Sequence, residues 1–158
     1  MSTHVAPYEQ KAAPEVRGTR DATRILVPIG RVLFAFIFVL AAPRHFTSQA
    51  AQYAASQGVP LAAIAVPLSG VIALAGGLSV MLGYRARVGA WLLVLFLVPV
   101  TFAMHAFWSV TDPMARQMQM VNFLKNLSML GGALLLAHFG AGPVSLDALR
   151  LREKHPDG

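Results

Sequence analysis

Four apolar segments dominate the chain, and each is long enough to cross a membrane as a helix. They cover residues 25–42, 61–83, 88–109 and 120–140. A helix needs about 20 predominantly apolar residues to span the roughly 30 Å hydrocarbon core of a bilayer. No regular alternation of apolar and polar positions, which would indicate strands, stands out. The pattern predicts an all-α fold, a four-helix transmembrane bundle.

Polar segments flank these spans and divide the chain. Residues 1–24 are polar and contain Pro7 and Pro14, so we expect a flexible tail there. Residues 25–142 form the predicted four-span membrane domain, and residues 143–158 a C-terminal tail. Between the first two spans, Thr47 or Ser48 is suited to cap a short helix lying along the membrane surface.

The composition agrees with a membrane protein and narrows the chemistry. The chain has 158 residues, of which 56% are apolar, and a mean hydropathy of +0.57. All seven acidic residues lie outside residues 22–111. The absence of cysteine excludes disulfides, thiolate-held iron–sulfur clusters and cysteine nucleophiles. The net charge of +6 does not indicate nucleic-acid binding, because the basic residues flank lipid-buried segments instead of forming one face of a soluble fold.

The basic residues predict the orientation of the bundle. One set of loops and tails carries nine of them, and the opposite loops carry only Arg44 and Arg116. Cytoplasmic loops of membrane proteins are enriched in Lys and Arg, so both termini are predicted to be cytoplasmic. The nine residues are Lys11, Arg17, Arg20, Arg24, Arg85, Arg87, Arg150, Arg152 and Lys154.

Small residues mark where helices are expected to approach closely. Glycine at a helix surface lets two backbones come together within the membrane. The predicted helix-packing positions are Gly70, Gly76 and Gly77 in the second span, and Gly131 and Gly132 in the fourth.

The polar residues of the spans fall mostly in the half predicted to face outward. Thr101, His105 and Trp108 follow a spacing of four and then three residues, which places them on one helical face. If three helix ends converge at this level, they form an outer-half pocket for an electron-rich carbonyl oxygen, such as that of a quinone, or a small anion. The predicted pocket residues are Arg44, His45, Thr101, His105, Trp108, Asn122, Lys125 and Asn126.

Several of these residues also have simpler interpretations. Lys125 costs roughly 2.5–3.5 kcal/mol about two turns inside a span unless it finds a polar environment, and it can instead extend to the outer headgroups. His105 can bond Thr101 or a backbone carbonyl, and Trp108 can anchor the helix at the interface. Two histidines, His45 and His105, are too few to indicate haem, and the sequence predicts no metal site.

Short motifs recur in a fixed order along the chain: Gly30-Arg31, Gly58-Val59-Pro60, Gly76-Gly77, Leu82-Gly83, His105 with Phe107-Trp108, Phe123 to Leu127, Gly131-Gly132, Gly140 to Pro143, and Ser145-Leu146-Asp147. This ordered set resembles the DoxX family of small four-span membrane proteins. The resemblance covers about residues 30–147. It implies a multi-pass protein of the bacterial inner membrane that acts as a membrane subunit of a quinone-linked oxidoreductase, with other oxidoreductase subunits or further copies of itself as partners. It leaves open whether the chain itself is catalytic. The competing hypothesis is a non-catalytic accessory or assembly subunit of a larger membrane complex.

Overall fold

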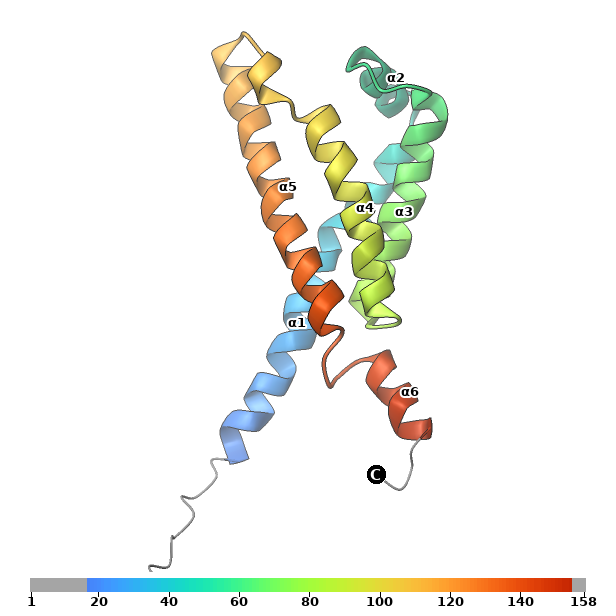
Figure 1. Ribbon diagram of the computed structural model, residues 1–158, viewed down its shortest axis with the longest axis vertical. Helices are drawn as coiled ribbons and strands as arrows, with labels where there is room; N and C mark the ends of the chain where they lie inside the picture. The colour runs from blue at the N-terminus through green and yellow to red at the C-terminus, as the bar shows by residue number, and fades with distance from the viewer. Residues whose placement is uncertain (1–16, 155–158) are drawn as a thin grey trace, which may run out of the picture.

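The computed structural model describes residues 17–154, and every regular element in that range is a helix (Figure 1). Four of its helical segments are long and apolar enough to cross a membrane: Arg24–Phe46, Ala62–Leu82, Ala86–Ser109 and Pro113–Phe139. The predicted all-α, four-span fold is confirmed, whereas the orientation of the termini stays a prediction. The elements are α1 (Arg17–Ala41), η1 (Ala42–Phe46), α2 (Ser48–Ser56), α3 (Ala62–Leu82), α4 (Ala86–Met104), η2 (Phe107–Ser109), α5 (Pro113–Phe139) and α6 (Leu146–Lys154).

Both predicted tails contain helix. Helix α1 begins at Arg17, inside the segment expected to be a flexible tail, and α6 forms within residues 143–158. The rest of these tails, residues 1–16 and 155–158, lies outside the described residues. Helix α5 begins before the predicted residue 120, because Pro113 occupies its first turn and the Asp112 side chain accepts a hydrogen bond from the Ala115 amide at 2.8 Å.

The four long helices pack in the order α1, α3, α4, α5, so α4 lies between α3 and α5. Helices α3 and α5 diverge towards the end of the bundle that carries α2 and η2, which we call the α2 end; the opposite end is the α6 end (Figure 1). Small side chains allow the close contacts of the core. Its buried residues are Ala35, Phe38, Val80, Ala90, Leu93, Leu97 and Ala133.

Glycines occupy the points of closest approach between helices. A Cβ atom at Gly76 would lie 2.9 Å from the Gly89 carbonyl oxygen, so α3 and α4 cross with their backbones nearly touching. Similar contacts place Gly70 against His45 and Gly77 against Phe38. The remaining two predicted packing glycines differ: Gly132 lies against Phe34, whereas a Cβ atom at Gly131 would meet nothing within 4 Å.

At the α6 end, the buried side chain of Arg31 joins three segments of the chain. It is only 5% exposed. Its guanidinium donates to the carbonyl oxygens of Met81 at 3.4 Å and Val144 at 3.2 Å, and also to that of Ala141. Because five fixed N–H donors suit several acceptors at once, Arg31 ties α1 to the end of α3 and to the α5–α6 loop. We call these contacts the Arg31 network.

Asp147 caps the first turn of α4 from a distant part of the sequence. Its carboxylate accepts hydrogen bonds from the backbone amides of Arg85 at 2.7 Å and Ala86 at 3.0 Å. Its own amide donates to the Gly83 carbonyl at 2.8 Å. The carboxylate therefore accepts hydrogen bonds from two amides that lack a partner within the helix, and its negative charge interacts favourably with the positive end of the helix dipole.

The Asp147→Ala variant is expected to lose about 1–2 kcal/mol of stability, because those two amides lose their acceptor. Thermal unfolding in detergent micelles measures the loss. The control is Asp112→Ala, which removes a cap from the first turn of α5 with one amide bond. A loss for Asp147→Ala no larger than that for Asp112→Ala would contradict the importance of this long-range cap.

Candidate functional site

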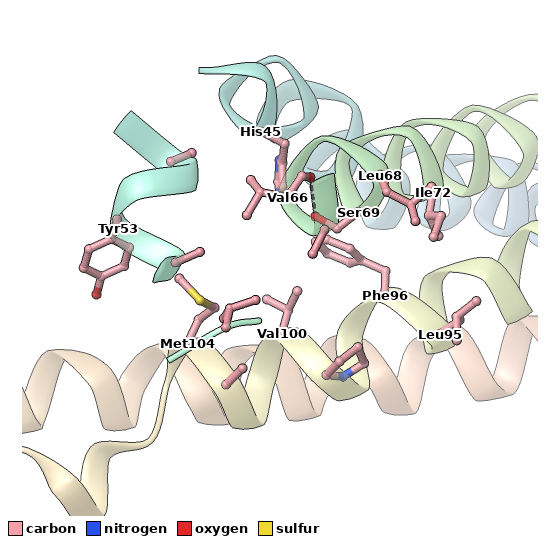
Figure 2. Close-up of a pocket in the computed structure, with 16 residues that line it drawn as sticks. His45, Tyr53, Val66, Leu68, Ser69, Ile72, Leu95, Phe96, Val100 and Met104 are labelled. Atoms are coloured by element: carbon pink, nitrogen blue, oxygen red, sulfur yellow. Dashed lines mark hydrogen bonds between the residues drawn. The ribbon is translucent and has the colours of Figure 1, made fainter. Parts of the chain in front are cut away.

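A cavity of about 420 Å³ lies near the α2 end, between α2, α3 and α4 (Figure 2). This volume lies in the roughly 300–1,000 Å³ range that is usual for small-molecule sites. Among the described residues that line it, none is Asp, Glu, Lys or Arg. We call it the α2 pocket. Its lining consists of His45, Ala50, Tyr53, Ala54, Val59, Ala65, Val66, Leu68, Ser69, Ile72, Leu95, Phe96, Pro99, Val100, Ala103 and Met104.

The short helix α2 forms one wall of this pocket. Its first turn is capped by Thr47, whose hydroxyl accepts from the Ala50 amide at 3.3 Å. After the helix ends, Gly58 adopts a φ of +81°, which a residue with a side chain rarely takes, and the chain turns back into α3. The cap and the glycine turn together hold α2 beside the first turns of α3 (Figure 1).

Two polar side chains, His45 and Ser69, lie in the pocket wall near the start of α3 (Figure 2). The His45 Nδ1 atom lies 3.3 Å from the Ala41 carbonyl oxygen, and the imidazole packs on the edge of Phe96 with ring centroids 5.6 Å apart. The Ser69 hydroxyl donates to the Val66 carbonyl at 2.7 Å. Both side chains are therefore oriented by backbone carbonyls of their own helical segments.

A chain of three polar side chains bridges the helices beside the pocket. The side-chain oxygen of Gln119 on α5 lies 2.8 Å from His105 Nδ1. The side-chain nitrogen of Gln119 donates a hydrogen bond to the Tyr53 hydroxyl at 3.4 Å. Since the amide oxygen only accepts, His105 Nδ1 is the donor. The chain connects α5 to α2, which are far apart in sequence.

Of the predicted pocket residues, His45 alone lines the α2 pocket. Thr101 is buried, but its hydroxyl donates to the Leu97 carbonyl of the same helix at 2.6 Å. Trp108 is exposed and its ring packs on the edge of Phe123, 5.8 Å between centroids. Arg44 is also exposed. The structure therefore does not gather these side chains around one cavity.

The predicted residues of α5 also lie apart from the pocket. Lys125 is exposed and its ammonium donates to the Asn122 side chain at 3.1 Å. Asn126 is buried within α5, which packs on the side of α4 away from α3. Because neither Arg44 nor Lys125 lines the α2 pocket, a small anion would meet no cationic side chain among its described lining residues.

Sequence reasoning missed Tyr53 and Gln119 as members of a connected group, and Arg31 as a buried residue. The signal for Arg31 was the charge itself, well inside an apolar span, which requires polar partners. In the part of the chain that the structure describes, no three His, Asp or Glu side chains come close enough together to hold a metal ion.

Comparisons with known proteins place the chain in a family. A sequence model of the SURF4 family matches residues 7–152. Two Escherichia coli proteins named inner membrane protein YphA and inner membrane protein YqjF are each 31% identical to the chain, over 80% and 78% of it and over 91% and 90% of their own lengths. A Schizosaccharomyces pombe Surfeit locus protein 4 homolog is 31% identical over 75% of this chain and 35% of its own length. No solved structure matches.

These matches correct the family inferred from the short motifs, because the DoxX assignment is wrong. The motifs that suggested it are general requirements of the bundle: Gly76 allows α3 and α4 to cross, Arg31 and Gly83 close the α6 end, and Asp147 caps α4. These roles concern the packing of the bundle, so the motifs do not by themselves identify a family. The protein is a multi-pass inner-membrane protein, and the chain belongs to the SURF4 family.

Proposed function

We propose that this protein binds a lipid-soluble small molecule in the α2 pocket, with the apolar body of the ligand against α3 and α4 and its polar head near His45 and Ser69. The lining of the pocket supports this proposal most directly. It is almost entirely aliphatic and aromatic, with few polar groups, which is the pattern of sites that orient an apolar ligand by its head. The pocket belongs to two spanning helices, α3 and α4, so a ligand dissolved in the bilayer has a short path to it.

A quinone belongs to this ligand class, because it combines a polar ring with an apolar chain. If the bound molecule is a quinone, the protein serves as a quinone-binding subunit of an oxidoreductase system. The small-anion alternative has less support, since the described lining carries no cationic side chain.

Filling the pocket is expected to weaken ligand binding by about tenfold or more. Ala103 lines the pocket from α4, and Ala103→Phe places a bulky ring in the space the ligand would occupy. A tenfold loss of affinity corresponds to about 1.4 kcal/mol of binding free energy. The binding of 4-octylphenol to the protein in lipid nanodiscs, counted by native mass spectrometry, measures the effect.

The matched control is Ala63→Phe, which adds the same ring at an exposed position of α3 that does not line the pocket. It is expected to bind the probe as the parent protein does. Equal binding by Ala103→Phe and the parent, with both variants folded, would rule out the pocket as the site.

A second candidate function is the accessory subunit, favoured by one observation on α5. Lys125 and Asn122 form an exposed hydrogen-bonded pair within a spanning helix, and a partner helix with an acceptor would remove them from lipid. Purification in native nanodiscs distinguishes the two functions. Small molecules in the same fraction without protein partners support the pocket, whereas stoichiometric protein partners without a bound small molecule support the accessory subunit.

A further inference from the structure

The polar groups in the wall of the α2 pocket present lone pairs and few free protons. We infer that the pocket takes a ligand whose head donates a hydrogen bond: a lipid-soluble alcohol or phenol, including the hydroxyl form of a quinone, and not its carbonyl or ether counterpart. This inference rests on the proposed function, since it concerns the ligand of the same pocket.

His45 supplies the first acceptor. The Ala41 carbonyl oxygen can only accept, so the contact at 3.3 Å requires the proton of the imidazole to be on Nδ1. In the neutral ring, Nε2 then carries a lone pair and no proton. No described residue forms a hydrogen bond with Nε2. The His45 side chain therefore offers an acceptor to a ligand in the pocket that its ring lines.

Ser69 supplies the second acceptor. A hydroxyl has one proton and two lone pairs, and the proton of Ser69 is used in the bond to the Val66 carbonyl, drawn as a dashed line in Figure 2. Its oxygen keeps its lone pairs. The next residue, Gly70, lies directly against His45, since a Cβ atom there would come within 2.6 Å of the His45 Cβ. The two acceptors thus belong to one region of the wall.

The backbone of α4 has a carbonyl near the pocket that lacks its usual helical donor. Pro99 has no N–H, so the carbonyl of Leu95 loses the donor that it would otherwise find four residues later. Leu95 and Pro99 both line the pocket. A proline inside a spanning helix therefore frees a carbonyl on a turn that contributes residues to the pocket lining.

Tyr53 is the lining residue that keeps a proton to donate, and it lies at the edge. Its hydroxyl accepts from Gln119, and Figure 2 shows it directed away from His45 and Ser69. A ligand head that can only accept would leave the acceptors on that wall desolvated and unpaired. Sites built to pair with a hydroxyl discriminate strongly against the analogue that lacks it, because their buried polar groups are then unsatisfied.

The test compares ligands that differ by one methyl group on the head oxygen. The probes are 4-octylphenol against 4-octylanisole, and 1-decanol against 1-methoxydecane, each added to the full chain in lipid nanodiscs at pH 8, where histidine is ordinarily neutral. Native mass spectrometry counts bound probe, and empty nanodiscs give the amount held by lipid alone. We expect at least one hydroxyl probe to bind about fivefold to tenfold more tightly than its methyl ether.

The two pairs of probes distinguish two classes of ligand that carry a hydroxyl. Preference in the aromatic pair alone identifies a phenol of the quinol kind, and preference in the aliphatic pair indicates a lipid alcohol. Equal binding of alcohol and ether in both pairs overturns the inference while leaving the proposed function intact. Binding of no probe above the lipid background contradicts the proposed function itself.

A variant then tests whether the preference for the hydroxyl probes depends on His45 in the pocket wall. His45→Phe keeps an aromatic ring beside Phe96 but removes the Nε2 acceptor, so the hydroxyl preference should fall to about twofold or less. His138→Phe makes the same change at an exposed position of α5 outside the pocket and should preserve the preference. A hydroxyl preference unchanged in His45→Phe would overturn the role of His45 as an acceptor.

Discussion

Replacing Arg31 with Met should lower the free energy of unfolding by about 3–5 kcal/mol, the largest loss expected for a single side chain of this protein. Met occupies similar space but donates no hydrogen bond. The carbonyl oxygens of Met81, Ala141 and Val144 would lose a charged donor in a site where Arg31 itself is 5% exposed. Hydrogen bonds to a charged group contribute more than neutral ones, and buried acceptors left unpaired add a desolvation cost.

Unfolding by sodium dodecyl sulfate titration from mixed micelles measures the change. Arg31→Lys is the informative companion, because an ammonium keeps the charge but cannot reach three acceptors with a planar fork, so its loss should be intermediate. Arg116→Met removes an exposed arginine near the start of α5 and should change stability by less than about 1 kcal/mol. Equal stabilities of Arg31→Met and Arg116→Met would show that the Arg31 network contributes nothing.

Replacing Gly89 with Leu is expected to cost about 3 kcal/mol or more and to separate α3 from α4. A Cβ atom at Gly89 would collide with the Ser79 side chain and lie 3.0 Å from the Gly76 carbonyl oxygen, so even the first added atom has no space. Backbone cannot move aside as a flexible side chain does, and overpacking of a tight contact carries a steep penalty.

The control is Gly131→Leu on α5, where an added Cβ atom would meet nothing within 4 Å. The same substitution there should be neutral or stabilising by up to about 1 kcal/mol, because leucine favours a helix more than glycine does. The comparison of the two variants in the same detergent titration isolates the helix crossing from helix propensity. A smaller loss at Gly89 than at Gly131 would contradict the packing argument.

The four spans could be predicted from the sequence because hydrocarbon thickness imposes a length on each apolar segment. Helix α5 begins at Pro113, before the apolar segment that starts at residue 120, and hydropathy does not detect the cap that Asp112 forms with Ala115. The Arg31 network could not be predicted from the sequence, for a different reason. Its acceptors are backbone carbonyls, which every residue possesses, so no pattern of side chains in the sequence predicts which carbonyls accept.

The predicted site depended on which helices are neighbours, and the sequence does not supply that information. Depth places His45, Thr101 and Lys125 near one level, but α4 lies between α3 and α5, so residues of α5 and of α3 are on its opposite sides. The α2 pocket is formed mainly by residues such as Val66 and Val100, which look like ordinary lipid-facing or core positions in a sequence. Its polar chemistry depends on the orientation of His45 and Ser69, which only coordinates reveal.

The cap that Asp147 places on α4 also has a consequence for the order in which the protein is made. A chain emerging from the ribosome presents Arg85 and Ala86 long before it presents Asp147, and the carbonyls of Ala141 and Val144 that hold Arg31 come late as well. The first three spans must therefore enter the membrane before the contacts of Asp147 and the Arg31 network at the α6 end can form. Closure of the α6 end therefore waits for residues 141–147, and a nascent chain interrupted before Asp147 would carry the four spans of the described part but lack these contacts.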